Sequence, residues 1–315
     1  MPVFKLNFLP KEPIEFDMNL DHIRNRASAW TLPPHDEETR NAVQDLLTAE
    51  DPTGLQEAFH QDLAFGTGGM RGLMGPGTNR MNSAVVAMAT QGLADYLKSQ
   101  CTGDISVAIA HDSRHKSDEF TRVASEVFAG NGIQAHVFSA LRPTPELSFA
   151  IRQLCCQAGI VITASHNPKE YNGYKVYWGD GGQIVPPHDK GIIERVRAVE
   201  GLNAVRRAAS SSPLIQTIGP SLDEAYYDTI AAHRISASLI EEGSDLSMVY
   251  SPLHGTGTVS MAPALAKCGF RNVEVLAEQA DPDGAFPTVD SPNPEEASAL
   301  RMALERAEVS GAELV

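Results

Sequence analysis

The sequence of 315 residues lacks a long apolar run, an excess of basic residues and a cysteine motif. Its longest apolar stretches, residues 105–110 and 159–164, have strand length, whereas a membrane-spanning helix needs about 20 apolar residues. Lysine and arginine number 25 against 40 aspartates and glutamates, so the formal net charge is −15. This acidity is unlike a general nucleic-acid or anionic-membrane binder, and we expect neither kind of partner.

The four cysteines form no C-x-x-C pair, and two of them are adjacent, at Cys155 and Cys156. Neighbouring cysteines rarely bridge, so the pattern predicts a reduced, cytoplasmic protein. The first 17 residues contain charges of both signs and three prolines. Because they hold no uninterrupted apolar region, they do not resemble a signal peptide, and Met18 is an alternative start.

What is present is a regular alternation of strand and helix patterns. Strands are predicted at 105–110, 134–139 and 159–163, and helices at 36–50, 85–97, 117–129 and 145–156. A stretch rich in serine, glycine and proline, residues 201–221, is typical of a linker. The alternation then restarts, with helices at 221–234, 259–268 and 293–307 and strands at 246–250 and 272–276. This order is typical of largely parallel sheets, and the length favours two domains.

The most specific segment is residues 162–177, ITASHNPKEYNGYKVY. It places Ser165 and His166 at the carboxyl end of an apolar strand, where side chains face a cleft. Asn172 and Gly173 are predicted to form a tight turn, with Lys175 in the strand that follows. A structural interpretation also fits: a capping serine, a loop histidine and a solvated lysine. A hydrolase elbow is excluded, because G-x-S-x-G is absent.

Several further motifs occur in a fixed order along the chain. They are GTGGMRG (66–72), HDSR (111–114), TASHNP (163–168), NGYK (172–175), YSPLHGTG (250–257), PDGAFP (282–287) and PNPE (292–295). Together they resemble the α-D-phosphohexomutase superfamily of phosphoglucomutases and phosphomannomutases from about residue 36 onward. The GTGGMRG form is most similar to the phosphoglucomutase-2-like branch.

The resemblance implies an α/β fold of two consecutive mixed α/β sandwich domains. We expect an N-terminal extension over 1–35, a first domain with the active-serine loop over 36–205 and a second domain over 206–315. The pattern from Ala312 indicates the start of a strand. The resemblance places a D-x-D-x-D-R metal loop after that strand, so we expect an amino-terminal fragment whose second domain is incomplete.

The implied activity is an intramolecular phosphotransfer between hexose 1-phosphate and 6-phosphate, with glucose as the expected sugar. A phosphoserine would donate its phosphoryl group, and glucose 1,6-bisphosphate would be the intermediate and activator. One Mg²⁺ per active site would assist in the full-length enzyme, whereas the fragment alone is expected to be inactive. The alternatives are a phosphomannomutase, a phosphopentomutase or a non-catalytic phosphosugar-binding module. The oligomeric state stays open.

The resemblance also implies roles for individual residues. Those with expected catalytic roles are Ser165, His166, Lys175 and Arg71. Those expected to bind substrate are Thr67, Gly68, Arg71, Arg114 and Lys175. Ser165 would bind the metal through its phosphate, and the aspartate ligands would lie beyond Val315. Arg71 is favoured as an electrostatic clamp, because the pKa of arginine exceeds about 12.

The D-x-D-G pattern at Asp281–Gly284 suggests a different function, a haloacid-dehalogenase-type phosphatase. That chemistry needs its aspartates directly after a buried strand, whereas residues 277–280 intervene here. The phosphatase interpretation is therefore disfavoured.

Overall fold

The computed structural model describes residues 20–315, which divide between two compact units. Within the described range, the first unit comprises residues 20–62 and 76–79, and the second comprises 63–75 and 80–315. None of the helices in residues 20–315 is both long and apolar enough to cross a membrane. The question of Met18 as a start falls outside the described residues.

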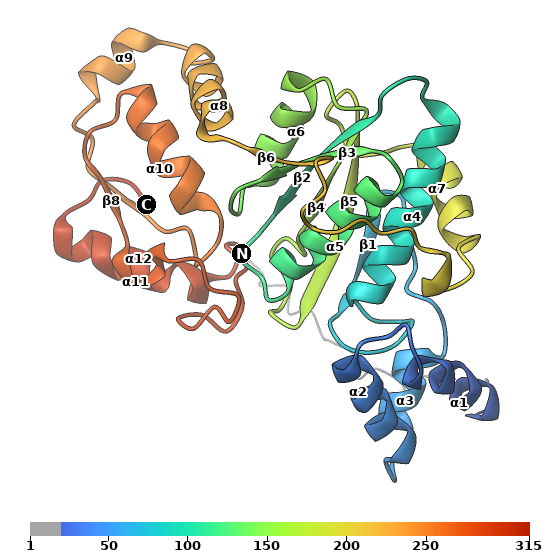
Figure 1. The fold of residues 1–315 in the computed structure, drawn as a ribbon. Helices are drawn as coiled ribbons and strands as arrows, with labels where there is room; N and C mark the ends of the chain where they lie inside the picture. Colours follow the sequence, from blue (N-terminus) through green and yellow to red (C-terminus); the bar gives the residue numbers. More distant parts are fainter. Residues whose placement is uncertain (1–19) are drawn as a thin grey trace. The chain divides into compact units, whose positions relative to one another are not determined.

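The first unit is a small group of helices, drawn in blue in Figure 1. It contains α1 (Leu20–Ser28), a 3₁₀ turn (Ala29–Thr31), α2 (Glu37–Thr48) and α3 (Thr53–Phe59). The predicted helix from residue 36 is confirmed as α2, and Asp36 caps it by accepting a hydrogen bond from the Thr39 amide at 2.7 Å. The rings of Trp30 and Phe59 meet edge to face in the core of this unit.

The second unit is built on a six-stranded sheet. Its strands, in spatial order, are β1 (Gly69–Leu73), β5 (Tyr171–Trp178), β4 (Ala158–Ile162), β2 (Ser106–His111), β3 (Gln134–Phe138) and β6 (Ile215–Ile218). Neighbours from β4 to β6 run parallel, and β5 is antiparallel to both β4 and β1. The strands predicted near 105–110, 134–139 and 159–163 are confirmed.

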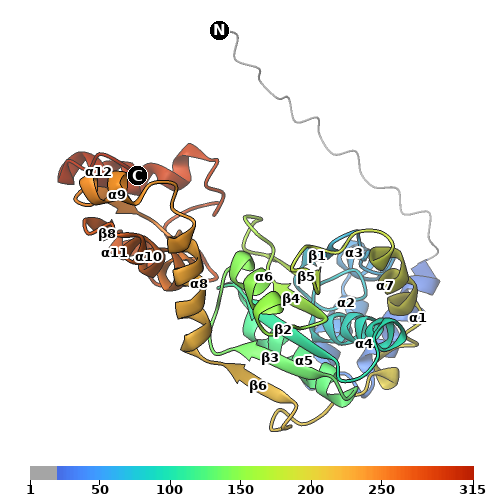
Figure 2. The ribbon, with the colours of Figure 1, turned by 90° about the horizontal axis from the view of Figure 1, so that it is seen from above.

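Helices cover both faces of this sheet (Figure 1 and Figure 2). One face carries α4 (Ser83–Gln100), α5 (Ser117–Gly130) and α7 (His188–Arg197), and the other carries α6 (Thr144–Gln153). Beneath α6, Leu147 and Ile151 pack on Ala108, Ala110 and Val161 of the strands. The sandwich implied by the resemblance is therefore observed.

Asn172 and Gly173 do not form the predicted turn, because both lie inside β5. The Asn172 side chain is buried and donates to the His115 carbonyl at 3.1 Å and the Ser117 hydroxyl at 3.0 Å. A Cβ on residue 173 would lie 2.6 Å from the Thr163 carbonyl oxygen. The pair thus allows close approach of adjacent strands, which explains why a turn-like dipeptide occurs in a strand.

Two other expectations about elements need correction. The helix predicted over 145–156 ends at Gln153, and Cys155 has a left-handed φ of 52° that a helix does not continue through. The stretch expected as a linker contains β6, which pairs with β3. The first sheet therefore extends beyond the expected domain boundary at residue 205.

The remainder of the second unit has shorter strands. Its elements are α8 (Pro220–Ala232), α9 (Ala237–Glu242), β7 (Met248–Tyr250), α10 (Gly257–Cys268), β8 (Val273–Val275), α11 (Ala277–Ala280) and α12 (Ala297–Ser310). β7 and β8 are parallel, and Leu314 forms a single bridge to Met248. α12 begins four residues later than predicted, because Asn293 caps a turn at Glu295 instead of the helix.

Candidate active site

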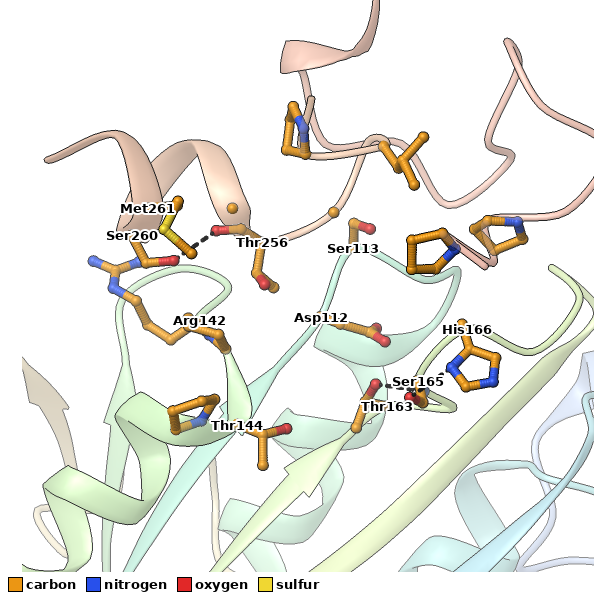
Figure 3. A pocket seen from close by; sticks show the side chains of 18 of the residues that line it. Asp112, Ser113, Arg142, Thr144, Thr163, Ser165, His166, Thr256, Ser260 and Met261 are labelled. Atoms are coloured by element: carbon orange, nitrogen blue, oxygen red, sulfur yellow. Dashed lines mark hydrogen bonds between the residues drawn. The ribbon is translucent and has the colours of Figure 1, made fainter. Parts of the chain in front are cut away.

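A cleft of about 570 Å³ opens beyond the carboxyl ends of β2 and β4 (Figure 3). From the first sheet it is lined by Asp112, Ser113, Thr163, Ser165 and His166. The opposite wall includes Thr256 and Ser260, at the amino end of α10. This position matches the expectation that ligands of parallel sheets bind beyond the strand ends.

Ser165 lies three residues after the end of β4, with its backbone in the left-handed region at φ 59°. The residue is exposed, and its amide donates to the Thr163 hydroxyl at 2.9 Å. Left-handed backbone is uncommon for a residue other than glycine, and such strain clusters at functional sites. The turn directs the hydroxyl of Ser165 away from the sheet core and into the cleft.

The loop that contains Ser165 is held by Arg114, which is only 3% exposed. Its Nη1 donates to the carbonyls of Pro168 and Tyr171 at 2.8 and 3.0 Å, and its Nη2 donates to those of Ser165 and Asn167. Burial lowers the pKa of Arg114, and the charge of Asp112 opposes that shift. The observed geometry supports a role in holding the loop, while direct substrate contact by Arg114 stays a prediction.

His166 is exposed, and its Nδ1 lies 3.4 Å from the Ser165 hydroxyl oxygen. The ring lines the same cleft. The structure therefore places both residues at the cleft, and their catalytic roles stay predictions. At 3.4 Å this contact is longer than a strong hydrogen bond between the two groups.

Arg71 and Lys175 come from β1 and β5, beside the serine loop. Arg71 lies opposite Gly173 of β5, and Lys175 comes two residues after Gly173 in the same strand, so the side chains of Arg71 and Lys175 share one face of the sheet. Lys175 in turn pairs with Val161 of β4. Arg71 Nη1 donates to Asn167 Oδ1 at 2.9 Å. Neither side chain lines the cleft described above, although Val161 does.

The ammonium group of Lys175 is in an unfavourable environment for its charge. Burial is the main cause that lowers its pKa, the positive charge of Arg71 lowers it further, and Asp112 raises it. A lysine with a lowered pKa is more readily neutral and able to accept a proton. The two basic side chains therefore share one face of the sheet, and the catalytic roles expected of them stay predictions.

Thr67 and Gly68 lie in the turn before β1, where Thr67 is exposed. The Gly68 carbonyl accepts hydrogen bonds from the Val176 amide at 3.0 Å and the Gln183 side chain at 3.1 Å. The next residue, Gly69, has φ 133°, and a Cβ there would lie 2.0 Å from the Tyr174 carbonyl oxygen. These contacts fix the glycine loop against β5, and its binding role stays a prediction.

Arg142 is a cleft residue that the sequence motifs did not indicate. It follows β3 and makes a bidentate ion pair with Asp223 of α8, with its Nε 3.0 Å and its Nη2 2.7 Å from the two carboxylate oxygens. Glu146 lies beside this pair and is fully buried. The position of Arg142 after a predicted strand was the signal available, since parallel strands present their ligand loops there.

Residues 20–315 contain no group of three histidine, cysteine, aspartate or glutamate side chains that could hold a metal ion. Ser165 contributes one oxygen. Asp112 Oδ1 accepts from the Arg114 amide and the Ser117 hydroxyl at 2.9 and 2.8 Å, and Oδ2 lies 3.4 Å from Arg114 Nε. Mg²⁺ prefers about six oxygen ligands. The described residues therefore do not fit a Mg²⁺ site by themselves.

Comparison with known families gives two matches along the chain. The model described as phosphoglucomutase/phosphomannomutase, alpha/beta/alpha domain I, matches residues 62–202. The model for domain II of the same family matches residues 224–315. The two matches cover most of the chain and both regions that line the cleft.

Individual proteins agree with these matches. A probable phosphoribomutase of Schizosaccharomyces pombe is 38% identical over 287 residues, which cover 90% of this chain and 49% of that protein. A phosphoglucomutase of Staphylococcus haemolyticus is 34% identical over 273 residues, covering 87% of this chain and 50% of that protein. The chain thus spans about half the length of the curated relatives it matches.

A solved structure is also similar. The crystal structure of a "putative phosphomannomutase" from Thermus thermophilus superposes with a TM-score of 0.67 at 28% identity, over 78% of this chain and 52% of the other. The fold of the chain and the order of its motifs therefore both agree with the family matches.

Proposed function

Because the chain belongs to the phosphoglucomutase/phosphomannomutase family, we propose that it carries the phosphoserine site of a phosphosugar mutase. Ser165 is the phosphoryl carrier. The observation that supports this most directly is the left-handed Ser165 turn, which faces a cleft and is held by a buried arginine.

The proposed reaction transfers one phosphoryl group in each direction. In the first step the bond between phosphorus and the Ser165 oxygen breaks, and a bond from phosphorus to a hydroxyl oxygen of the sugar monophosphate forms. The hydroxyl proton passes to a base, the departing Ser165 oxygen takes up a proton, and the sugar becomes a bisphosphate. After the intermediate turns around, its other phosphoryl group leaves the sugar oxygen and bonds to the Ser165 oxygen, with the two protons moving in the opposite sense. Such transfer depends mainly on placement and on neutralisation of spread charge.

The residues near Ser165 divide these tasks between them. Lys175, whose pKa is lowered, is the proposed proton acceptor and donor, and Arg71 stabilises the transferring phosphoryl group as a fixed positive charge. His166 and the turn at Thr67 and Gly68 bind phosphate or sugar hydroxyls. The phosphate on Ser165 would be the one ligand from this chain for the Mg²⁺ that the resemblance implies, and that ion would supply charge neutralisation.

The proposed substrate is a hexose phosphate in the cytoplasm. Glucose 1-phosphate and glucose 6-phosphate are the expected pair, with glucose 1,6-bisphosphate as intermediate and activator. A pentose phosphate is the second candidate, because one of the similar proteins is named a probable phosphoribomutase. A mannose phosphate and a non-catalytic phosphosugar-binding role are the remaining alternatives. Initial rates on glucose, mannose and ribose 1-phosphates separate them.

The test replaces the hydroxyl in the protein that contains this chain. Ser165→Ala is expected to abolish isomerisation of the sugar phosphate, because no carrier oxygen remains. Ser238→Ala, the same change on an exposed serine of α9 that does not line the cleft, is expected to retain activity within a few-fold of the unsubstituted protein. Undiminished isomerisation by Ser165→Ala would contradict the proposal.

A further inference from the structure

The turn of residues 281–288, here called the Phe286 turn, has no part in the proposed chemistry. It lies after α11, and Phe286 within it is 6% exposed with a left-handed φ of 49°. The Phe286 ring lies over the Arg114 guanidinium, 5.4 Å from its centroid. An aromatic face attracts such a cation and covers one side of it.

The backbone of the Phe286 turn also meets the Arg114 segment directly. A Cβ on Gly284 would lie 2.5 Å from the His115 amide nitrogen and 2.8 Å from the Ser113 carbonyl oxygen. Only a glycine permits this approach, because real Cβ contacts are essentially never under 3.0 Å. The turn is therefore fitted to the segment that carries Arg114 by a ring contact and by close backbone packing.

His254 fixes the Phe286 turn from the other side. It is 4% exposed, its Nδ1 lies 3.0 Å from the Asp281 carbonyl, and its own carbonyl accepts the Asp283 amide at 3.0 Å. Because a carbonyl oxygen only accepts, Nδ1 carries the proton. Nε2 lies 2.9 Å from the Thr288 hydroxyl, at the far end of the turn.

We propose that His254 and the Phe286 turn are positioning elements that keep Arg114, and through it the backbone of Ser165, in the phosphoryl-accepting geometry. Arg114 uses both Nη atoms on four carbonyls of the serine loop. Without the ring, water can reach the guanidinium and accept its hydrogen bonds. The guanidinium then holds those four carbonyls less firmly. The SPLHG and PDGAFP motifs, which also contribute Leu253 and Phe286 to the cleft wall, then act on Ser165 through Arg114. Their catalytic consequence rests on the proposed function.

The test compares variants at the ring and at the close approach. Phe286→Leu removes the aromatic face, and Phe286→Tyr keeps it as the conservative rescue. Gly284→Ala introduces the backbone clash. Gly219→Ala is the matched control, since φ there is −85° and a Cβ would meet nothing within 4 Å.

Hydrogen exchange of the 315-residue chain, followed by mass spectrometry, measures the order of the serine loop. We expect the Ser165 and Asn167 amides to exchange about tenfold faster in Phe286→Leu and Gly284→Ala, because both amides report local opening of this loop. Phe286→Tyr and Gly219→Ala are expected to match the unsubstituted chain. Thermal unfolding identifies variants that lose the whole fold, and the comparison of Phe286→Leu with Phe286→Tyr remains decisive if Gly284→Ala is one of them.

A second readout follows the reaction in the protein that contains this chain. Phe286→Leu is expected to lower kcat about tenfold with KM within about twofold, since loop placement acts on the transferring group rather than on sugar binding. Unchanged exchange and kcat in Phe286→Leu and Gly284→Ala would overturn the positioning role. If Ser165→Ala kept full activity, the proposed function would fail instead, and hydrogen exchange would still decide whether the turn orders the loop.

Discussion

At the scale of single residues, the site depends on groups held in states that free amino acids do not favour. Ser165 has left-handed backbone, Arg114 is a buried cation, and Lys175 has a lowered pKa. Each of these states depends on neighbouring groups, so we expect each to change when those groups are removed. The sequence identified all three positions from their motifs, but not the buried partners that fix them.

The lowered pKa of Lys175 depends in part on the charge of Arg71. Removal of that charge in Arg71→Gln is expected to raise the pKa of Lys175 toward its ordinary value. The pH profile of lysine acetylation, followed at Lys175 by peptide mass spectrometry, is then expected to move to higher pH. Arg301→Gln, which removes an arginine paired with Glu305 on α12, is the control and should leave the profile in place. An unchanged profile in Arg71→Gln would exclude this electrostatic coupling.

Glu146 makes stability depend on pH. Burial, followed by the neighbouring Asp223, raises its pKa to about 8 from 4.5, so the native state holds a proton that the unfolded state releases. The resulting stability is complete below about pH 4.5 and is lost as the pH rises to about 8.

Glu146→Gln keeps the side chain neutral and is expected to remove that loss. At pH 8 the variant should exceed the unsubstituted chain by about 1–3 kcal/mol in free energy of unfolding, and the two should converge near pH 5. Urea unfolding at several pH values measures this. Glu305→Gln, at an exposed pair on α12, should show a pH dependence like that of the unsubstituted chain. A constant difference between Glu146→Gln and the parent across pH would contradict the assignment.

At the scale of elements, the alternation of strands and helices was predictable where the apolar pattern was strong. The observed ends of β2, β3, β4 and α5 lie within about two residues of the predicted ends, which is ordinary for element boundaries. The failures have local causes. β6 is a four-residue edge strand with two exposed residues, so it has almost no apolar signal. The Asn172–Gly173 pair carries turn chemistry, and tertiary contacts place it in a strand.

Gly173 allows the central strands to approach the serine loop. Gly173→Ala is expected to destabilise the chain by about 1–3 kcal/mol through overpacking, because the new Cβ would lie 2.6 Å from the Thr163 carbonyl and 3.0 Å from that of Met70. Chemical denaturation measures the loss. Gly219→Ala has open space and should change the free energy of unfolding by less than about 0.5 kcal/mol. Equal stability of both variants would show that the strands can move apart to accept the new Cβ without a loss of folding free energy.

At the scale of the whole molecule, the sequence predicted the fold class and the family through the order of its motifs. It could not predict that Arg142 and Ser260 line the same cleft, because side chains from distant segments meet only after folding. It also could not assign roles to the SPLHG and PDGAFP motifs, because the contacts of Phe286 with Arg114 and of His254 with Asp281 are tertiary.

The lack of a metal-binding cluster in residues 20–315 leads to a further expectation. Millimolar Mg²⁺ should leave the thermal midpoint of the unphosphorylated 315-residue chain within about 1 °C, because a ligand stabilises only a state that binds it. CaCl₂ at equal ionic strength is the control for general salt effects. A midpoint that rises with Mg²⁺ alone would show a site that these residues form after all.

The central claim is that the Ser165 oxygen carries a phosphoryl group. Phosphopeptide mapping by mass spectrometry, on the intact protein isolated from its own cells, tests it most directly. Phosphate on the peptide that spans residues 153–169, localised to Ser165 and lost on incubation with a sugar monophosphate, is the predicted result. An active protein whose Ser165 is always unmodified would contradict the account.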